Sequence, residues 1–234
     1  MLAIFKREFK SFFTTPLGYV ILIIVNIFSG VQFWFGTLYN DTVDMSPVFS
    51  GFTMIVLSAI PILTMRLFSE ERRQKTDQAL LTAPVSLVGI VMAKFFAAFL
   101  LYVIGISITL VYSVILAFVA QPTWGYIFGN YLGLLLMGSS LIAVGLFISS
   151  VTENQLVAAM VSYATMFMLI MLSSFSNLIP VPFIAKALYW LSFSTRYDSF
   201  VSGIVSLSNV MFFLSATVIC LFLTTRVLEK RRWG

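Results

Sequence analysis

Residues able to perform acid–base, nucleophilic or metal chemistry are scarce in this chain. Its 234 residues include no histidine and one cysteine, Cys220, which lies in an apolar run. Histidine-based catalysis and histidine-ligated metal sites are therefore excluded, and the cysteine cannot form an internal disulfide. The phosphate-binding pattern GxxxxGK[ST] is absent, because no glycine is followed by lysine. The sequence predicts no catalytic residue, no metal site and no cofactor bound by this chain.

The polar residues gather instead between Arg66 and Ser86, a stretch with seven charged residues and a long apolar segment on either side. Ser69 can cap a short helix there, with Glu70 and Glu71 at its N-terminal end, where negative charge is favourable. Glu71 is also expected to pair with Lys75 on the same helix, four residues later. The stretch is therefore expected to be structured.

A second short helix is expected directly after the first. Thr76 or Asp77 can cap its N-terminus, and Pro84 ends it because the residue before a proline disfavours the α conformation. Three apolar side chains would be exposed on it: Ala79, Leu80 and Leu81. Such an element is shaped to sit in a cleft on another protein, and a merely solvated connecting loop is the alternative.

The surrounding chain is too apolar for a water-soluble protein. It is 60% hydrophobic and 10% charged, whereas soluble domains are about 45–50% apolar and about 25% charged. The apolar runs are continuous over 18 residues or more, which indicates membrane-spanning helices and not barrel strands. We expect an all-α integral membrane protein with a single membrane domain over residues 1–234 and six spans: 17–38, 48–68, 87–119, 127–151, 156–175 and 210–227.

Two segments outside the spans are also expected to contact the membrane. Residues 1–15 have apolar and basic faces at helical spacing, typical of an amphipathic helix in the membrane interface. Residues 183–203 are apolar but contain Lys186, Arg196 and Asp198, and each charge at mid-bilayer would cost about 2.5–3.5 kcal/mol. We therefore predict re-entrant or interfacial helices at the outer face between spans five and six. The third span, with about 33 residues or about 50 Å, is expected to tilt, bend or extend into water.

The positive charges set the orientation. With six spans and both termini cytoplasmic, two of the 14 lysines and arginines face outward, namely Lys186 and Arg196. The other twelve face the cytoplasm: Lys6, Arg7, Lys10, Arg66, Arg72, Arg73, Lys75, Lys94, Arg226, Lys230, Arg231 and Arg232. This asymmetry follows the positive-inside rule and places residues 69–86 in the cytoplasm. It also accounts for the net charge of +5 without nucleic acid as a partner.

Isolated polar residues within the spans are candidates for lining a transport pathway. They are Asn26, Gln32, Asn130 and Ser139. Hydrogen bonding between helices is the alternative role for each of them. No ionisable residue clearly lies at the centre of a span, which argues against an ion-coupled transporter.

The sequence ERRQKTDQALLTAPVS, from Glu71 to Ser86, resembles the type-2 ABC transporter permeases. Relative to that family's pattern, Lys75 replaces glycine, Asp77 replaces glutamate and Ala93 replaces glycine. The C-terminal part of the chain resembles the gliding-motility (GldF-like) branch. The residues that match the family pattern are Glu71, Thr76, Leu80, Leu81, Pro84, Val85, Ser86 and Lys94.

The resemblance implies the permease subunit of an exporter in the cell membrane. The permease would form a homo- or heterodimer bound to two separately encoded ABC-type ATPase subunits, which would bind the ATP and Mg²⁺. Membrane lipid and an auxiliary membrane subunit are further implied partners. The residues that would couple the permease to the ATPase are Glu71, Thr76, Asp77, Ala79, Leu80, Leu81 and Pro84.

Three other functions fit an apolar chain of this kind. An ATP-independent channel or secondary transporter would show broken spans and inverted repeats, which we do not see. A membrane enzyme would need a catalytic cluster. A non-transporting scaffold coupled to an ATPase has no sequence feature that distinguishes it from a transporter. No feature of the sequence identifies the substrate.

Overall fold

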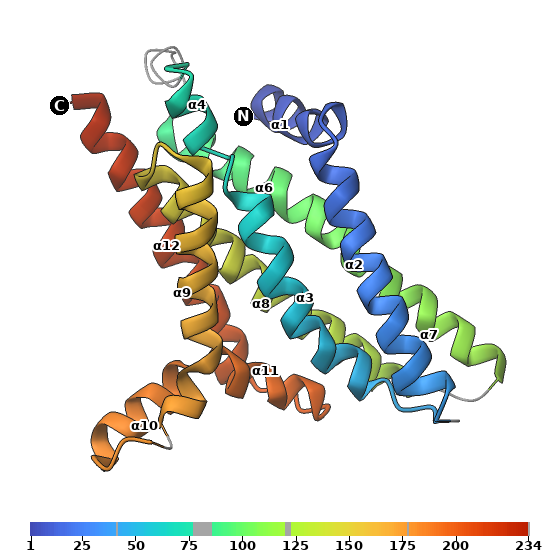
Figure 1. Ribbon diagram of the computed structural model, residues 1–234. Coiled ribbons are helices and arrows are strands. Elements are labelled where there is room, and N and C mark those ends of the chain that lie inside the picture. The colour runs from blue at the N-terminus through green and yellow to red at the C-terminus, as the bar shows by residue number, and fades with distance from the viewer. Residues whose placement is uncertain (41, 77–85, 120–122, 177, 234) are drawn as a thin grey trace.

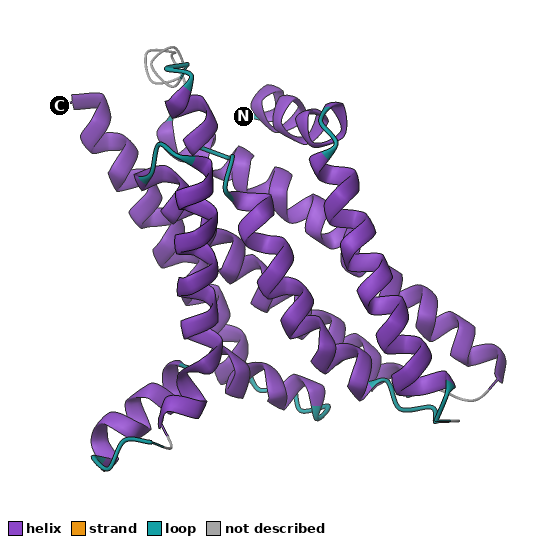
Figure 2. Cartoon of the chain, in the orientation of Figure 1, coloured by secondary structure: helices purple, strands orange, loops and turns teal. Residues whose placement is uncertain are grey.

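The computed structural model describes residues 1–40, 42–76, 86–119, 123–176 and 178–233. Every regular element within them is a helix (Figure 2). Six helical segments are long and apolar enough to cross a membrane, which confirms the expected all-helical architecture with six candidate spans. They are Leu17–Leu38, Ser46–Arg73, Leu87–Phe118, Trp124–Val151, Gln155–Ser176 and Leu207–Arg232.

Several candidate spans contain local breaks. α2 (Leu17–Phe33) continues into the π-helical turn η1 (Trp34–Leu38). α3 (Ser46–Thr64) contains Pro61, and after a turn the chain resumes as the short helix α4 (Ser69–Arg73). The long third apolar run is divided at Ser107 into α6 (Leu87–Ile106) and α7 (Ile108–Val119). The remaining spans are α8 (Trp124–Val151), α9 (Gln155–Ser176) and α12 (Leu207–Trp233).

The interior is built around α8 and α3. In the most apolar 18-residue stretch of each candidate span, the buried share is 83% for α8 and 67% for the span that begins with α3. It is 28% or less for the spans of α2, α9 and α12. α8 packs against α3, α6, α9, α11 and α12. A helix that is apolar on all sides is favourable at the centre of such a bundle.

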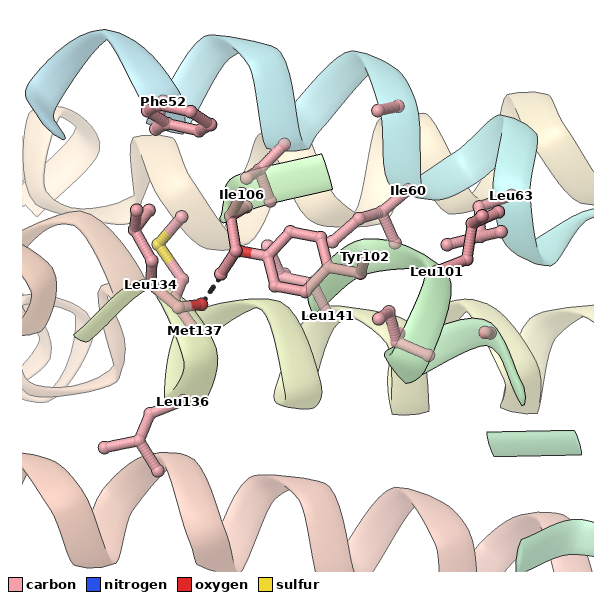
Figure 3. Packing of buried hydrophobic residues seen from close by; sticks show 14 of the residues in the cluster. Phe52, Ile60, Leu63, Leu101, Tyr102, Ile106, Leu134, Leu136, Met137 and Leu141 are labelled. Atoms are coloured by element: carbon pink, nitrogen blue, oxygen red, sulfur yellow. Dashed lines mark hydrogen bonds between the residues drawn. The ribbon is translucent and has the colours of Figure 1, made fainter. Parts of the chain in front are cut away.

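Close helix contacts depend on glycines of α8. Figure 3 shows Tyr102 of α6 between α3 and α8, where its hydroxyl donates to the Leu134 carbonyl at 2.8 Å. A Cβ atom at Gly138 would lie 2.1 Å from the Tyr102 ring, and one at Gly145 would lie 2.2 Å from the Thr64 hydroxyl. Small residues at helix interfaces allow backbones to approach in this way.

The two ends of the bundle differ in what they carry. α1 (Leu2–Thr14), α4 and the C-terminal end of α12 lie at one end, and α10 and α11 lie at the other (Figure 1). Many of the charged groups are at the first end, which we call the basic end and define by Arg7, Arg66, Arg72, Lys94 and Arg231. Both chain termini lie at the basic end (Figure 1).

The segment between α9 and α12 forms two helices of different character. α10 (Pro182–Leu191) has no buried residue and exposes Tyr189 and Trp190. α11 (Phe193–Val201) is packed into the bundle, where the buried Tyr197 donates to the Phe49 carbonyl at 2.8 Å. The guanidinium of Arg196 stacks on Trp190 and donates to Asn209. These helices lie at the end opposite the basic end.

Candidate functional site

A lysine is buried inside the bundle at the basic end. The side chain of Lys94, in the second turn of α6, is 1% exposed. Its Nζ donates to the Leu67 carbonyl at 2.6 Å, and it lies 5.1 Å from the centre of the Phe68 ring. A buried ammonium is costly unless it is paired and hydrogen-bonded.

Two carboxylates from different helices provide the pairing. Glu8 of α1 lies 3.2 Å from the Nζ of Lys94, and Glu71 of α4 lies 3.0 Å from it. Arg7 of α1 joins the same two carboxylates from the solvent side, at 2.8 Å from Glu8 and 2.7 Å from Glu71. These four residues form a closed ring of alternating charge, here called the four-charge ring. It ties α1, α4 and α6 together.

The ring shifts the ionisation of its members on α1. Burial opposes ionisation of Glu8, but Lys94 and Arg7 together outweigh it, so the pKa of the Glu8 carboxyl lies below its ordinary value. The hydrogen bond to Glu8 raises the pKa of Arg7, although partial burial opposes this. Both groups are therefore held in their charged forms.

A second set of contacts, made by hydrogen bonds, connects the junction between α3 and α4 to α8. The hydroxyl of Ser149 accepts from the backbone N–H groups of Phe68 and Ser69, at 3.1 and 3.2 Å, and donates to the carbonyl of Met65. The prediction that Ser69 caps α4 is wrong, because its side chain donates back to Met65 and α4 has no side-chain cap. A buried serine on another helix satisfies these backbone groups instead.

Two arginines continue these connections. Arg72 of α4 donates to the Val151 carbonyl at the end of α8 and pairs with Glu153, both at 2.6 Å. Arg66 pairs with Glu70 at 3.3 Å and donates to Thr15, between α1 and α2, at 2.8 Å. The residues leading into the 77–85 segment are thus connected to α1, α6 and α8 and to the turns that follow α1 and α8.

The predicted coupling residues fall partly within this arrangement. Glu71 belongs to the four-charge ring, and its predicted pairing with Lys75 is wrong: α4 ends at Arg73, and Lys75 has a left-handed backbone with φ of 56°. Thr76 donates to the Glu71 carbonyl at 3.2 Å. The other predicted residues lie outside the described residues: Asp77, Ala79, Leu80, Leu81 and Pro84.

The sequence places Arg7 among the cytoplasmic charges and predicts no partner for Arg7 or Glu8. A usable signal was present, because Glu8 is the only acidic residue among the first 40. An acid within a basic amphipathic helix, together with a lysine inside a predicted span, is a charge pattern that favours a pairing between them.

The four predicted pathway residues are not brought together. Asn26 donates to Leu22 of its own helix, and Gln32 packs against Gly51. Ser139 donates to its own helix and contacts Thr217 at 3.3 Å, and Asn130 donates to Tyr126 while its buried Oδ1 has no partner. Among the described residues no hydrogen bond joins two of these four, and their role in a pathway stays a prediction.

The basic end offers structural connections and no evident reaction chemistry. Its ring carboxylates are occupied by cations, and no cluster of three potential metal ligands occurs in the part of the chain that the structure describes. An open cleft of about 320 Å³ adjoins the ring, lined in part by Arg66, Gln74 and Thr76. The charged residues of this end connect α1, α4 and α6.

Comparison with known protein families gives one result that spans most of the chain. The family described as ABC-2 family transporter protein matches residues 12–228. Among curated proteins, none matches this sequence. The matched range runs from the last turn of α1 into α12 and includes Glu71 and Lys94.

Proposed function

We propose that a separate ABC-type ATPase drives export of a substrate through this chain. The premise is that the chain belongs to the ABC-2 transporter family and is the membrane subunit of an ABC transporter. The ATPase would hold ATP and Mg²⁺, since this sequence has no phosphate-binding loop. The permease would work as a dimer, as a homo- or heterodimer, in the cell membrane. An auxiliary membrane subunit would complete the assembly.

The observation that carries this proposal is the binding of Glu71 to Lys94 and Arg7. Residues 77–85 lie between α4 and α6. On the α4 side, Glu71 is held by the four-charge ring, and on the α6 side Ser86 caps the helix by accepting from the Gly89 N–H at 3.2 Å. A force applied to the intervening segment by an ATPase would therefore act on α1, α4 and α6 together.

The orientation follows from the charges. The basic end carries both termini and most of the lysines and arginines, so the positive-inside rule favours its location in the cytoplasm, where the ATPase would bind. α10 and α11 would then be at the outer face, with the exposed aromatic residues of α10 at the membrane interface. The proposed coupling residues remain Glu71, Thr76 and the segment beyond it.

The test is assembly with the ABC-type ATPase subunit that is proposed as the partner. Leu80→Arg plus Leu81→Arg should abolish co-purification and stimulation of ATP hydrolysis. The matched control is Leu178→Arg plus Val181→Arg, which also places two arginines at apolar positions, both exposed and at the opposite end of the bundle. The control should retain both properties.

Two results would contradict the proposal. One is an unchanged complex with unchanged ATPase stimulation in the Leu80/Leu81 variant. The other is substrate transport by the purified chain alone in liposomes at an undiminished rate, which would favour the ATP-independent channel. An intact, ATP-hydrolysing complex without any transport would favour the scaffold.

A further inference from the structure

An apolar groove lies between α1 and α6 near the basic end. It has a volume of about 540 Å³ and is lined chiefly by six apolar side chains: Leu2, Phe5, Phe96, Phe99, Leu100 and Val103. Leu2, Phe96 and Leu100 are 68%, 41% and 37% exposed. Within the described residues no other part of the chain covers it, so in a membrane its occupant is supplied by the surroundings.

The direction and length of the groove fit a lipid chain. From Phe96 to Val103 it follows α6 for seven residues, which is about 10 Å at a rise of 1.5 Å per residue. One leaflet of hydrocarbon is about 15 Å deep, half of the roughly 30 Å core. The groove starts next to α1 at the basic end and runs toward the bilayer centre, which matches the course of an acyl chain in that leaflet.

Two lysines of α1, Lys6 and Lys10, follow the groove residues Leu2 and Phe5 on the same helix. Lys6 follows Leu2 by four residues and Lys10 follows Lys6 by four, so the three side chains form one row on α1. Both lysines are exposed, and no ion pair joins either of them to another described residue, in contrast to Arg7. Like charges four apart destabilise a helix. An anion between the two ammonium groups would remove that repulsion.

We propose that the groove and the lysine pair together bind an anionic phospholipid of the inner leaflet. One acyl chain lies along α6 from Phe96 to Val103, and the phosphate lies between Lys6 and Lys10. Because α1 also carries Arg7 and Glu8, the lipid holds in place the helix that supplies half of the four-charge ring. The inner-leaflet assignment rests on the orientation given under the proposed function. The groove itself is distinct from the segment proposed to bind the ATPase, and lipid binding can fail or succeed without affecting ATPase binding.

Native mass spectrometry of the full chain, purified in detergent and titrated with dioleoyl phosphatidylglycerol or dioleoyl phosphatidylcholine, tests the site. The wild-type chain should retain one phosphatidylglycerol more tightly than phosphatidylcholine. Lys6→Gln plus Lys10→Gln should weaken phosphatidylglycerol retention about 30-fold, because each lysine near an anionic headgroup contributes about fivefold. The control Lys186→Gln plus Lys230→Gln removes the same charge elsewhere and should change retention little.

A second pair of variants tests the groove itself. Leu100→Trp should fill it and reduce retention of the lipid, whereas Leu223→Trp, at a similarly exposed leucine (40%) on α12, should not. Unchanged retention in Leu100→Trp, or equal binding of the neutral and anionic lipids, would overturn the proposal. Displacement of the lipid by millimolar inorganic phosphate would also overturn it, since the lysines would then be a site for free phosphate.

Discussion

Glu8 of α1 and Glu71 of α4 bind the same ammonium group, the Nζ of Lys94 within α6, at 3.2 and 3.0 Å. Arg7 links the same two carboxylates on the other side. One buried cation thus holds an N-terminal helix and the short helix before residues 77–85 against a membrane span. The first predictions concern this arrangement.

Removal of the buried cation should destabilise the bundle. Lys94→Met leaves Glu8 and Glu71 facing each other with only Arg7 between them, and breaking a buried pair in this way costs about 3–5 kcal/mol. We expect the melting temperature in detergent to fall by about 10 °C. Lys186→Met, at an exposed position on α10, should leave it unchanged. Equal stability of both variants would show that the ring contributes nothing to holding the helices together.

Substitutions of the two neighbouring glutamates of α4 should differ in their effect on stability and on ATPase stimulation. Glu71→Gln removes the charge that meets both Lys94 and Arg7, and we expect it to lower stability by about 1–3 kcal/mol and to reduce ATPase stimulation. Glu70→Gln removes a partly exposed pair with Arg66, worth about 0.5 kcal/mol. Thermal unfolding measures the stability of both variants, and ATPase assays on the assembled complex measure their stimulation of ATP hydrolysis. Equal losses for the two substitutions would contradict a special role for Glu71.

Acidification should weaken the attachment of α1. The pKa of the Glu8 carboxyl is lowered in the folded chain because Lys94 and Arg7 outweigh the effect of burial. The ionised carboxylate therefore contributes its full stabilisation above the ordinary pKa of 4.5, and this stabilisation is lost as the pH falls through the lowered pKa of the folded chain. The melting temperature should therefore decline below pH 4.5. Glu8→Gln should be less stable at neutral pH and should show a shallower decline. Glu229→Gln, at a surface pair with Arg226, should retain the wild-type pH profile. A wild-type pH profile for Glu8→Gln would contradict the stabilising role of the Glu8 carboxylate.

Two glycines of α8 provide a test of the packing. Gly138→Ala would place a methyl group 2.1 Å from the ring of Tyr102, so helices α6 and α8 would have to separate. Overpacking of this kind costs about 1–3 kcal/mol. At Gly125, in the first turn of the same helix, a Cβ atom has no neighbour within 4 Å, and Gly125→Ala should change stability by less than about 0.5 kcal/mol. Comparable melting temperatures for the two variants would disprove the close contact of Tyr102 with α8.

The orientation can be measured by cysteine labelling. Cys220 is the sole cysteine, so Cys220→Ala gives a background without thiols. In that background Phe183→Cys on α10 should react with a membrane-impermeant maleimide added to intact cells, and Gln74→Cys, which follows α4, should react only after permeabilisation. Both positions are exposed. The reverse pattern would place the basic end outside and would contradict the cytoplasmic docking of an ATPase.

The sequence was sufficient for the membrane helices. Continuous apolar runs such as Leu17–Leu38 predict a span from local composition alone, because hydrocarbon has no water to satisfy an unpaired backbone. The length of the third run predicts that it tilts, bends or extends into water, but it does not locate the break at Ser107, where no proline occurs. At the break the Ser107 hydroxyl donates to the Val103 carbonyl of the preceding turn at 2.6 Å, a bond that often bends helices.

The partners of the charged residues were decided by the tertiary structure. On a continuous helix Lys75 would be the nearest cation to Glu71, which is why the sequence predicted that pair. In the structure α4 ends at Arg73 and Lys75 turns away with φ of 56°. Glu71 binds instead to Lys94 and to Arg7, which come from α6 and α1. Local sequence determines which segments are helical and which charges they carry, but a buried ammonium pairs with the carboxylates that helix packing brings to it, and that depends on contacts between segments far apart in the chain.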